Sequence, residues 1–197
     1  MKMILTMFAA LTILSGCATT TQPQLTRQQW IDMTSRTYTD RTPDQVLNAA
    51  EELFRLADGN DFIISHSEDG LYAQRPWSVY IVLAYVEGTD TWVLQTKQDG
   101  SDTRVSVHLS NSVASTTALP TGGGGVAPYT GAATGSSVQG TAIYDVFWAR
   151  MDYLLGYSTN WMDCELANAR VKQGITWGDN FALCNIFNLE DNRPLSE

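Results

Sequence analysis

Residues 41–61, RTPDQVLNAAEELFRLADGND, carry the clearest helix signal in the chain, and the predicted architecture builds outward from them. Thr42 is a typical N-cap, Pro43 takes the first helical position, where its missing N–H costs nothing, and Gln45 completes a capping box. Gly59 marks the end of the helix. One apolar stripe recurs at spacings of three and four: Val46, Leu47, Ala50, Leu53, Phe54 and Ala57. The pattern predicts a helix of about four turns that lies on a sheet.

The segments after this helix change to an apolar period of two. They comprise residues 61–67, 71–75, 79–86, 91–97 and 103–110, with turns predicted between them, including 87–90 and 98–102. Because parallel crossovers need a dozen residues or more, these short connections favour an antiparallel meander of about four or five strands.

Two of these segments differ in the faces that they bury. Segment 103–110 alternates between apolar and polar residues, so one face of that strand is expected to meet water. Segment 79–86 is apolar on both faces, which predicts a central strand covered on both sides by the later helices or by another protein. Pro76 predicts that the adjoining strand starts or bends there.

Residues 111–140 are predicted to form a flexible, glycine-rich loop. The stretch contains four consecutive glycines at 122–125, and the chain has no Asp, Glu, Lys or Arg from Val105 to Tyr144. Consecutive glycines lose much backbone freedom in a regular element and gain no side-chain contact. Loops of this length are either functional or disordered, so a flexible segment that becomes ordered on a partner is the alternative. A phosphate-binding loop is excluded, because no lysine follows the glycines.

Helical spacing returns at 141–156, and a second helical segment is expected around 161–171. This second segment contains Cys164, and the following tail contains Cys184. In an oxidising compartment the two are expected to form a disulfide that clips the tail to the helix. Two separately buried thiols are the alternative.

The N-terminus has the pattern of a secretory leader, with Lys2 followed by an uncharged, largely apolar stretch at 3–14. This stretch is too short to span a bilayer, which needs about 20 residues. The residues LSGC at 14–17 resemble the lipobox of bacterial lipoproteins, in which the cysteine becomes the acylated first residue. Residues 1–16 are therefore expected to be a signal peptide and Cys17 the lipidation site. Ordinary cleavage at small residues, with Cys17 incidental, is the alternative.

The lipoprotein resemblance implies a place in the bacterial envelope. Ala18 follows the cysteine, and in this class a residue other than aspartate there favours the outer membrane, facing the periplasm. Residues 17–38 are polar and are expected to form a lipidated, flexible tether. Residues 39–197 are then expected to form a single domain, and they are enough for one hydrophobic core.

The charge balance limits the possible partners. The full chain carries 12 basic and 21 acidic side chains, for a formal net charge of −9. Nucleic acid is not an expected partner, because binding the phosphate backbone requires a basic patch. The expected partners are the membrane, through the lipid anchor, and a protein of the cell envelope.

Catalysis is not expected. A hydrolase needs a general base, and the chain has two histidines, His66 and His108. Ser65, Ser67 and Glu68 flank His66, but neighbours in a strand point to opposite faces. This geometry argues against a catalytic triad formed by neighbours in sequence. A periplasmic hydrolase with His66 as its base is kept only as an alternative. No cofactor or metal site is expected, because the histidines and cysteines lack the close pairing of zinc sites.

The tryptophans have two expected roles. Trp77, Trp92 and Trp148 fall inside predicted elements and are expected in the core. The remaining tryptophans are less constrained and could bind a small ligand or a glycan, which is a second alternative function.

Together these patterns predict an α+β fold: an N-terminal helix, an antiparallel meander, a glycine-rich loop and C-terminal helices on the sheet. The leader and this order of elements resemble accessory lipoproteins of envelope machines, such as the helix-grip modules of the barrel-assembly lipoprotein. The resemblance implies a non-enzymatic, outer-membrane-anchored component that has an accessory, structural or partner-binding role in a cell-envelope assembly.

Overall fold

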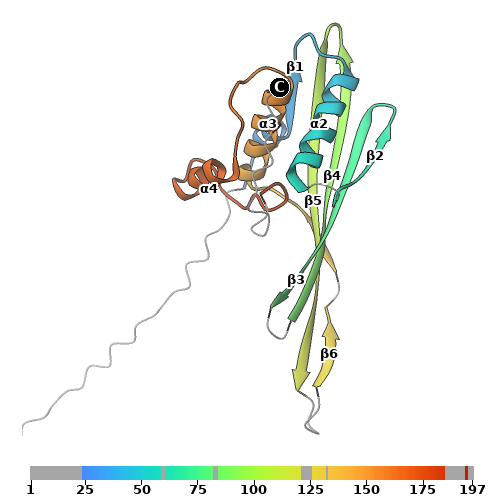
Figure 1. The fold of residues 1–197 in the computed structure, drawn as a ribbon, viewed down its shortest axis with the longest axis vertical. Coiled ribbons are helices and arrows are strands. Elements are labelled where there is room, and N and C mark those ends of the chain that lie inside the picture. The colour runs from blue at the N-terminus through green and yellow to red at the C-terminus, as the bar shows by residue number, and fades with distance from the viewer. Residues whose placement is uncertain are drawn as a thin grey trace, which may run out of the picture.

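The computed structural model describes residues 24–58, 61–81, 84–120, 126–131, 133–184 and 194. The predicted signal peptide, Cys17 and the glycine run lie outside these residues. The elements are α1 (Arg27–Thr34), β1 (Ser35–Tyr38), α2 (Pro43–Asp58), β2 (Ile63–Ser67), β3 (Gly70–Ile81), β4 (Ala84–Asp99), β5 (Asp102–Pro120), β6 (Val126–Thr130), β7 (Thr134–Ser137), α3 (Thr141–Leu154) and α4 (Cys164–Lys172). The fold is α+β, as predicted, with helices packed on an antiparallel sheet (Figure 1).

Helix α2 forms where the sequence predicts it. The Gln45 side chain accepts from the Thr42 backbone N–H at 2.9 Å, and the Thr42 hydroxyl accepts from the Gln45 backbone N–H at 3.3 Å. This is the predicted capping box. The whole apolar stripe is buried: Val46, Leu47, Ala50, Leu53, Phe54 and Ala57.

The sheet is organised around β5. Five of its strands lie in the order β1-β5-β4-β3-β2, and each neighbouring pair is antiparallel. One edge of β5 pairs with β4 over almost its whole length, and the other edge pairs in turn with β1, β7 and β6. The long strand is therefore central throughout, and short segments from distant parts of the chain complete its second edge.

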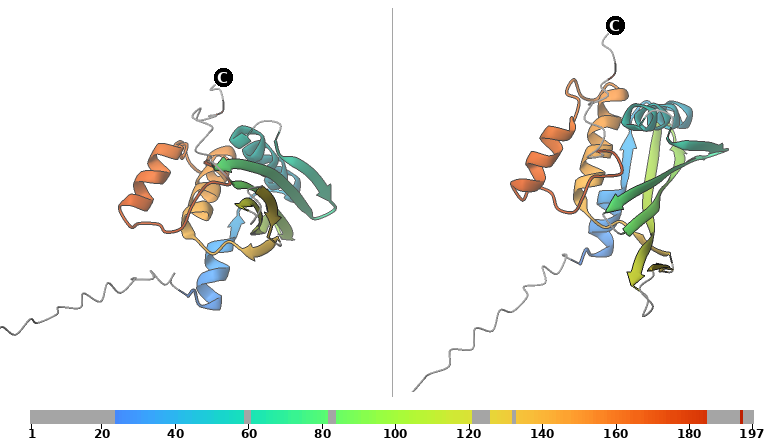
Figure 2. Two further views of the ribbon diagram at one scale, coloured as in Figure 1. Left: turned by 90° about the horizontal axis from the view of Figure 1, so that it is seen from below. Right: turned by 60° about the horizontal axis from the view of Figure 1, so that its bottom comes forward.

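The core lies between one face of the sheet and helices α2 and α3. The Trp92 ring from β4 lies 5.4 Å from Phe54 of α2 and 5.3 Å from Phe147 of α3, between ring centroids. These three rings join both helices to the sheet, and aromatic pairs of this kind add to burial. Helix α4 lies on the side of α3 away from the sheet (Figure 2).

The opposite face of the sheet carries polar and exposed residues. Along β5, Val105, Val107 and Leu109 are buried, whereas Ser106 and His108 are exposed. This alternation confirms the prediction that one face of this strand meets water.

The sheet continues beyond the helices as an arm. We use this name for residues 76–81 of β3, 84–89 of β4, 112–120 of β5, and β6. Figure 1 shows the helices beside the upper part of the sheet only, with the arm extending below them. The structure thus has a two-layered body and a single-layered extension.

The arm corrects the prediction of a central strand at 79–86. That segment is divided between β3 and β4, which pair as a hairpin with Ile81 opposite Ala84. The described residues of this segment therefore lie at the end of the β3–β4 hairpin and not in one central strand covered on both sides. Residues 87–90 are not a turn either but part of β4, because β3 and β5 hydrogen-bond to it on both sides.

Two predicted irregular stretches are also corrected. Residues 27–38 of the predicted tether form α1 and β1, because the Thr26 capping box starts the helix and β1 completes the edge of β5. In the predicted loop at 111–140, β5 continues to Pro120 and β6 and β7 pair back onto it. Pairing with β4 and with these returning strands satisfies the backbone groups there, although the side chains are small.

Candidate binding groove

A polar row marks the point where the helical cover of the sheet ends. Arg75 of β3, Asp90 of β4 and Asn111 of β5 lie opposite one another in register. An Arg75 Nη donates to Asp90 Oδ2 at 2.8 Å, and the Asn111 amide donates to Asp90 Oδ1 at 2.6 Å. The side chains of the ion pair are only 5% and 6% exposed. A buried charge pair this well hydrogen-bonded holds the three strands in a defined register.

A groove of about 370 Å³ opens on this row. Its floor is the helix-side face of the arm, where the alternating positions after Arg75 and Asn111 are apolar: Trp77, Val79 and Val113. Phe181, which is 52% exposed, and Val138 stand at its sides. An apolar lining with a few convergent polar groups is typical of a binding site.

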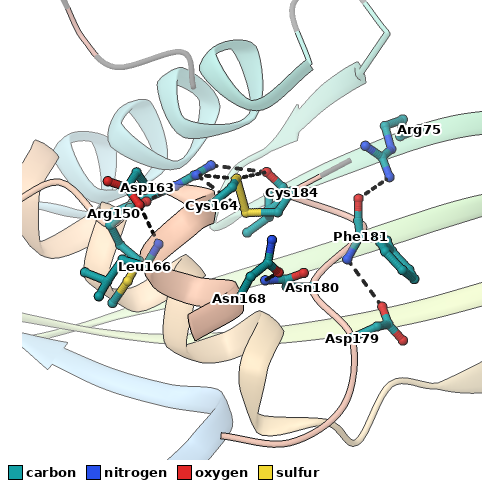
Figure 3. The surroundings of a disulfide bond; sticks show 12 residues. Arg75, Arg150, Asp163, Cys164, Leu166, Asn168, Asp179, Asn180, Phe181 and Cys184 are labelled. Carbon is teal, nitrogen blue, oxygen red and sulfur yellow. Dashed lines mark hydrogen bonds between the residues drawn. A yellow bond between two sulfur atoms is a disulfide. The ribbon is translucent and has the colours of Figure 1, made fainter. Parts of the chain in front are cut away.

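The segment that ends at Cys184 forms one wall of the groove, and Figure 3 shows how it is held. The predicted disulfide is present and joins Cys164 of α4 to Cys184, with their Cα atoms 5.5 Å apart. Arg75 donates to the Phe181 carbonyl at 2.8 Å, which ties the wall to the polar row. Asn180 donates to the Asn168 side chain of α4 at 3.2 Å.

Arg150 of α3 supports the same wall from behind. Its guanidinium is buried and donates to the carbonyl oxygens of Met162 and Leu183 at 2.9 and 3.3 Å. It also lies 3.3 Å from the Sγ of Cys164 and stacks over the Trp161 ring at 4.8 Å. The disulfide and this arginine together give the wall a fixed position relative to the sheet.

Gly88 fits Trp77 into the floor of the groove. The two residues are opposite each other in the β3–β4 register. A Cβ on Gly88 would lie 2.3 Å from Cζ2 of Trp77 and 2.7 Å from the Ser112 carbonyl oxygen. The indole therefore covers the glycine backbone, an arrangement in which only glycine leaves room for the ring.

Replacing Gly88 with alanine is expected to displace the Trp77 ring and to lower the free energy of unfolding by about 1–3 kcal/mol, the usual cost of overpacking. Urea unfolding and the near-ultraviolet circular dichroism of tryptophan measure the two effects. Gly135→Ala in β7 is the matched control, because its Cβ would meet its nearest neighbours at 3.7 Å. Equal stability of both variants would contradict this packing.

His66 lies away from the groove, at the far side of the body. Its Nε2 lies 2.6 Å from Oε2 of Glu51 on α2, and Arg55 donates to the other oxygen of the same carboxylate at 2.5 and 2.9 Å. Ser65 and Ser67 alternate with it along β2 and so point to the opposite face. The hypothesis that His66 acts as a hydrolytic base stays a prediction.

The hydrogen bond from Arg55, and to a lesser degree the contact with His66, lower the pKa of Glu51. A lowered pKa stabilises the folded state above the unfolded pKa of this carboxyl, and the contribution is lost as the pH falls through the folded value. Arg55→Met is therefore expected to raise the pKa of Glu51 more than His66→Ala does, as measured by a nuclear magnetic resonance titration. The reverse order would show that the histidine dominates.

His108 was not assigned a neighbour from the sequence, and the structure gives it one. Its Nε2 lies 3.2 Å from the Ser137 hydroxyl, at the exposed face where β7 pairs with β5. The Trp30 ring lies 6.2 Å from the imidazole, between centroids. The contact fastens β7 to β5 and does not line the groove.

Two other kinds of site are absent from the residues that the structure describes. Among them, no three or more His, Cys, Asp or Glu side chains gather where they could hold a metal ion. Nor does any helix in this part of the chain have the length and apolar character needed to cross a membrane.

The sequence assigned no residue to the groove, and the prediction that Trp77 lies in the core is wrong. Trp92 and Trp148 are buried, as expected for core residues, whereas Trp77 lies in the groove. Strand register brings Arg75, Asp90 and Asn111 together, so the sequence around each of them did not predict the row. A weak signal was present: each interrupts or ends an apolar alternation on the helix-side face.

The chain matches no protein-family model, no curated protein and no solved structure.

Proposed function

We propose that this protein is a non-enzymatic lipoprotein of the bacterial envelope, anchored through Cys17 to the outer membrane and facing the periplasm, and that it binds a partner protein in an envelope assembly. The observation that carries the proposal is the groove, where the helix-side face of the sheet passes out from under its helices. The helix-side face of a sheet is normally covered, so an apolar part of that face that no helix covers favours binding of a partner.

The open edge of β3 supports a protein as the occupant. Among the described residues, β2 pairs with β3 only as far as Gln74. Ile81 and Ala84 close the hairpin as a hydrogen-bonded pair, so the N–H and C=O groups of the odd-numbered residues of β3 point to β4. The N–H and C=O groups of Ser78 and Tyr80 therefore point to the open edge. Pro76, on the same edge, lacks an N–H and fits there without losing a bond. An extended segment of a partner could pair with this edge and place side chains in the groove.

Site-specific photo-crosslinking in living cells tests the proposal. A photoreactive residue at Val79, which lines the groove, is expected to capture one defined protein from the envelope. The same residue at Tyr72, on the opposite face of the same strand, is the matched control and should not capture that protein. Val113→Asp should abolish capture, because it places a charge on the apolar floor, whereas Ser110→Asp on the outer face should not.

Capture of the same proteins from Val79 and Tyr72, or of none from Val79, would contradict a partner at the groove. The anchor is tested separately by metabolic labelling with palmitate. Incorporation that Cys17→Ala abolishes would support lipidation, and an unlabelled mature protein would rule it out.

A small apolar ligand or a glycan is the second candidate occupant. The groove volume of about 370 Å³ is within the range of small-molecule sites, and Trp77 could stack on a ring. Titration of cell-wall fragments against tryptophan fluorescence tests this function. A saturable change that Trp77→Leu removes would support it, and a flat response with all fragments would exclude it.

A further inference from the structure

We propose that the tip of the β3–β4 hairpin inserts into the surface of the lipid bilayer to which Cys17 anchors the chain. This inference rests on the proposed lipid anchor and adds a second contact between the protein and the membrane. It concerns the tip residues Tyr80, Ile81, Ala84 and Tyr85, which lie beyond the groove at the end of this hairpin. Strands β5 and β6 continue past them, because Ala84 pairs with Thr117 and β6 pairs with β5 as far as Pro120.

The tip is apolar and uncovered. Tyr80 is 82% exposed and Ile81 is 57% exposed, and no described element covers either side chain. Exposed apolar groups gathered at a projecting tip are not expected on a protein that meets only water. The rings of Tyr80 and Tyr85 lie 4.9 Å apart across the hairpin, between centroids. Tyrosine is enriched where a protein crosses from water into lipid, because its ring is apolar and its hydroxyl is polar.

Residues 76–86, which include the end of the β3–β4 hairpin, are also uncharged. No Asp, Glu, Lys or Arg occurs in residues 76–86 or in residues 105–144, whereas the whole sequence carries 33 such residues. Charged groups resist transfer into lipid, so their absence from the tip and from the neighbouring β5–β6 hairpin removes the main cost of insertion. The same absence excludes attraction by anionic headgroups as the driving force.

Helix α1 begins on the side of the body from which the arm projects. Trp30 of α1 lies beside His108 of β5, and Ser35, further along the chain, is opposite Ser106. Since β5 runs toward the tip from Ser106 to His108, α1 runs away from the tip, and the chain enters the domain from the arm side. Figure 2 agrees, with the N-terminal end of α1 directed toward the same end as the arm.

The lengths match as well. β5 rises by about 20 Å from Asn111, in the polar row, to Thr117, which pairs with Ala84 at the tip. The chain between Cys17 and Thr26, where α1 is capped, can extend to about 30 Å. An anchored Cys17 therefore allows the tip to reach the same bilayer surface.

Fluorescence quenching by brominated lipid tests the insertion. The full lipidated chain with Tyr80→Trp is reconstituted into phosphatidylcholine vesicles with and without bromine on the acyl chains. The emission of the new tryptophan is obtained by subtracting the emission of the wild-type chain. It is expected to be blue-shifted in plain vesicles and largely quenched in brominated vesicles. Tyr72→Trp is the matched control on the same face of β3, and its added emission should persist.

Insertion also predicts two further results. Adding Ile81→Asp to the Tyr80→Trp chain should restore the emission, because a charge at the tip opposes burial in lipid. Salt and anionic lipid should leave the quenching unchanged, since residues 76–86 carry no charge to be screened. A strong dependence on either would overturn the proposal.

The remaining outcomes are each decisive. Equal quenching at positions 80 and 72 would overturn insertion, and so would a blue shift insensitive to bromine, which would place the tip against protein. The mass of the purified protein shows independently whether Cys17 is acylated, so an acylated but unquenched chain refutes the tip and leaves the anchor. If the mature chain is not acylated, its co-flotation with added vesicles is measured instead. Loss of co-flotation in Ile81→Asp would support insertion, and unchanged co-flotation would overturn it.

Discussion

Replacing Asp90 with alanine is expected to lower the free energy of unfolding by about 3–5 kcal/mol, the usual effect of removing one partner from a buried ion pair. Asp90 accepts from both Arg75 and Asn111, and the pair is almost fully buried. Without the carboxylate, the guanidinium stays in a low-dielectric site without that negative charge beside it. Urea denaturation of the purified chain measures the loss.

Two further variants separate charge from packing at this site. The double variant Arg75→Met/Asp90→Leu is expected to recover much of the stability, because neither charge then remains buried. Asp99→Ala, at the exposed turn between β4 and β5, is the matched control and should change stability by less than about 0.5 kcal/mol. A loss in Asp90→Ala no larger than this control would show that the pair is solvated.

The same double variant tests what the polar row does for binding. It keeps the apolar floor of Trp77, Val79 and Val113 but removes the charges at its end. If capture from Val79 survives in the stable double variant, the row serves register only. If capture is lost while stability is kept, the row takes part in recognition.

Removing the disulfide is the second large effect. The double variant Cys164→Ala/Cys184→Ala is expected to be less stable by about 3 kcal/mol, since the bond closes a loop with a sequence separation of 20 and restricts the unfolded chain. The free energy of unfolding is measured with and without reductant. Reductant should destabilise the wild-type chain by a similar amount and leave the double variant unchanged.

The disulfide also positions the groove, so its loss has a functional readout. Cys184 ends the wall segment that carries Phe181, and Arg150 reaches the sulfur atoms and the Leu183 carbonyl together. Capture from Val79 should therefore fall in the double variant under conditions where the chain remains folded. Undiminished capture would show that Arg75 and Arg150 hold the wall without the covalent bond.

Much of the fold was accessible from local patterns. The capping box and stripe of α2 predicted that helix to the residue at its start, because a cap and an amphipathic face are both local properties. The alternation at 103–110 predicted the buried and exposed faces of β5. The pairing of Cys164 with Cys184 was predicted from the expected oxidising compartment and from the lack of another cysteine after Cys17.

The turns show where local patterns failed. Residues 87–90, EGTD, contain typical turn residues yet continue β4, because two neighbouring strands supply hydrogen bonds to both of its edges. The hairpin between Ile81 and Ala84 is flanked by apolar, β-forming residues with no turn signal. A propensity of a few tenths of a kcal/mol per residue is overridden by a ladder of backbone hydrogen bonds.

The sequence by itself determined the helix–sheet class, the acidic and uncharged regions, and the cysteines available for pairing, since these depend on composition and short-range periodicity. Only the tertiary structure decided that the segment 79–86 is divided between the two strands of a hairpin and that Arg75, Asp90 and Asn111 form one row. The physical reason is strand register: residues far apart in the chain become neighbours only when long antiparallel strands align, and a shift by one residue would move every side chain to the other face.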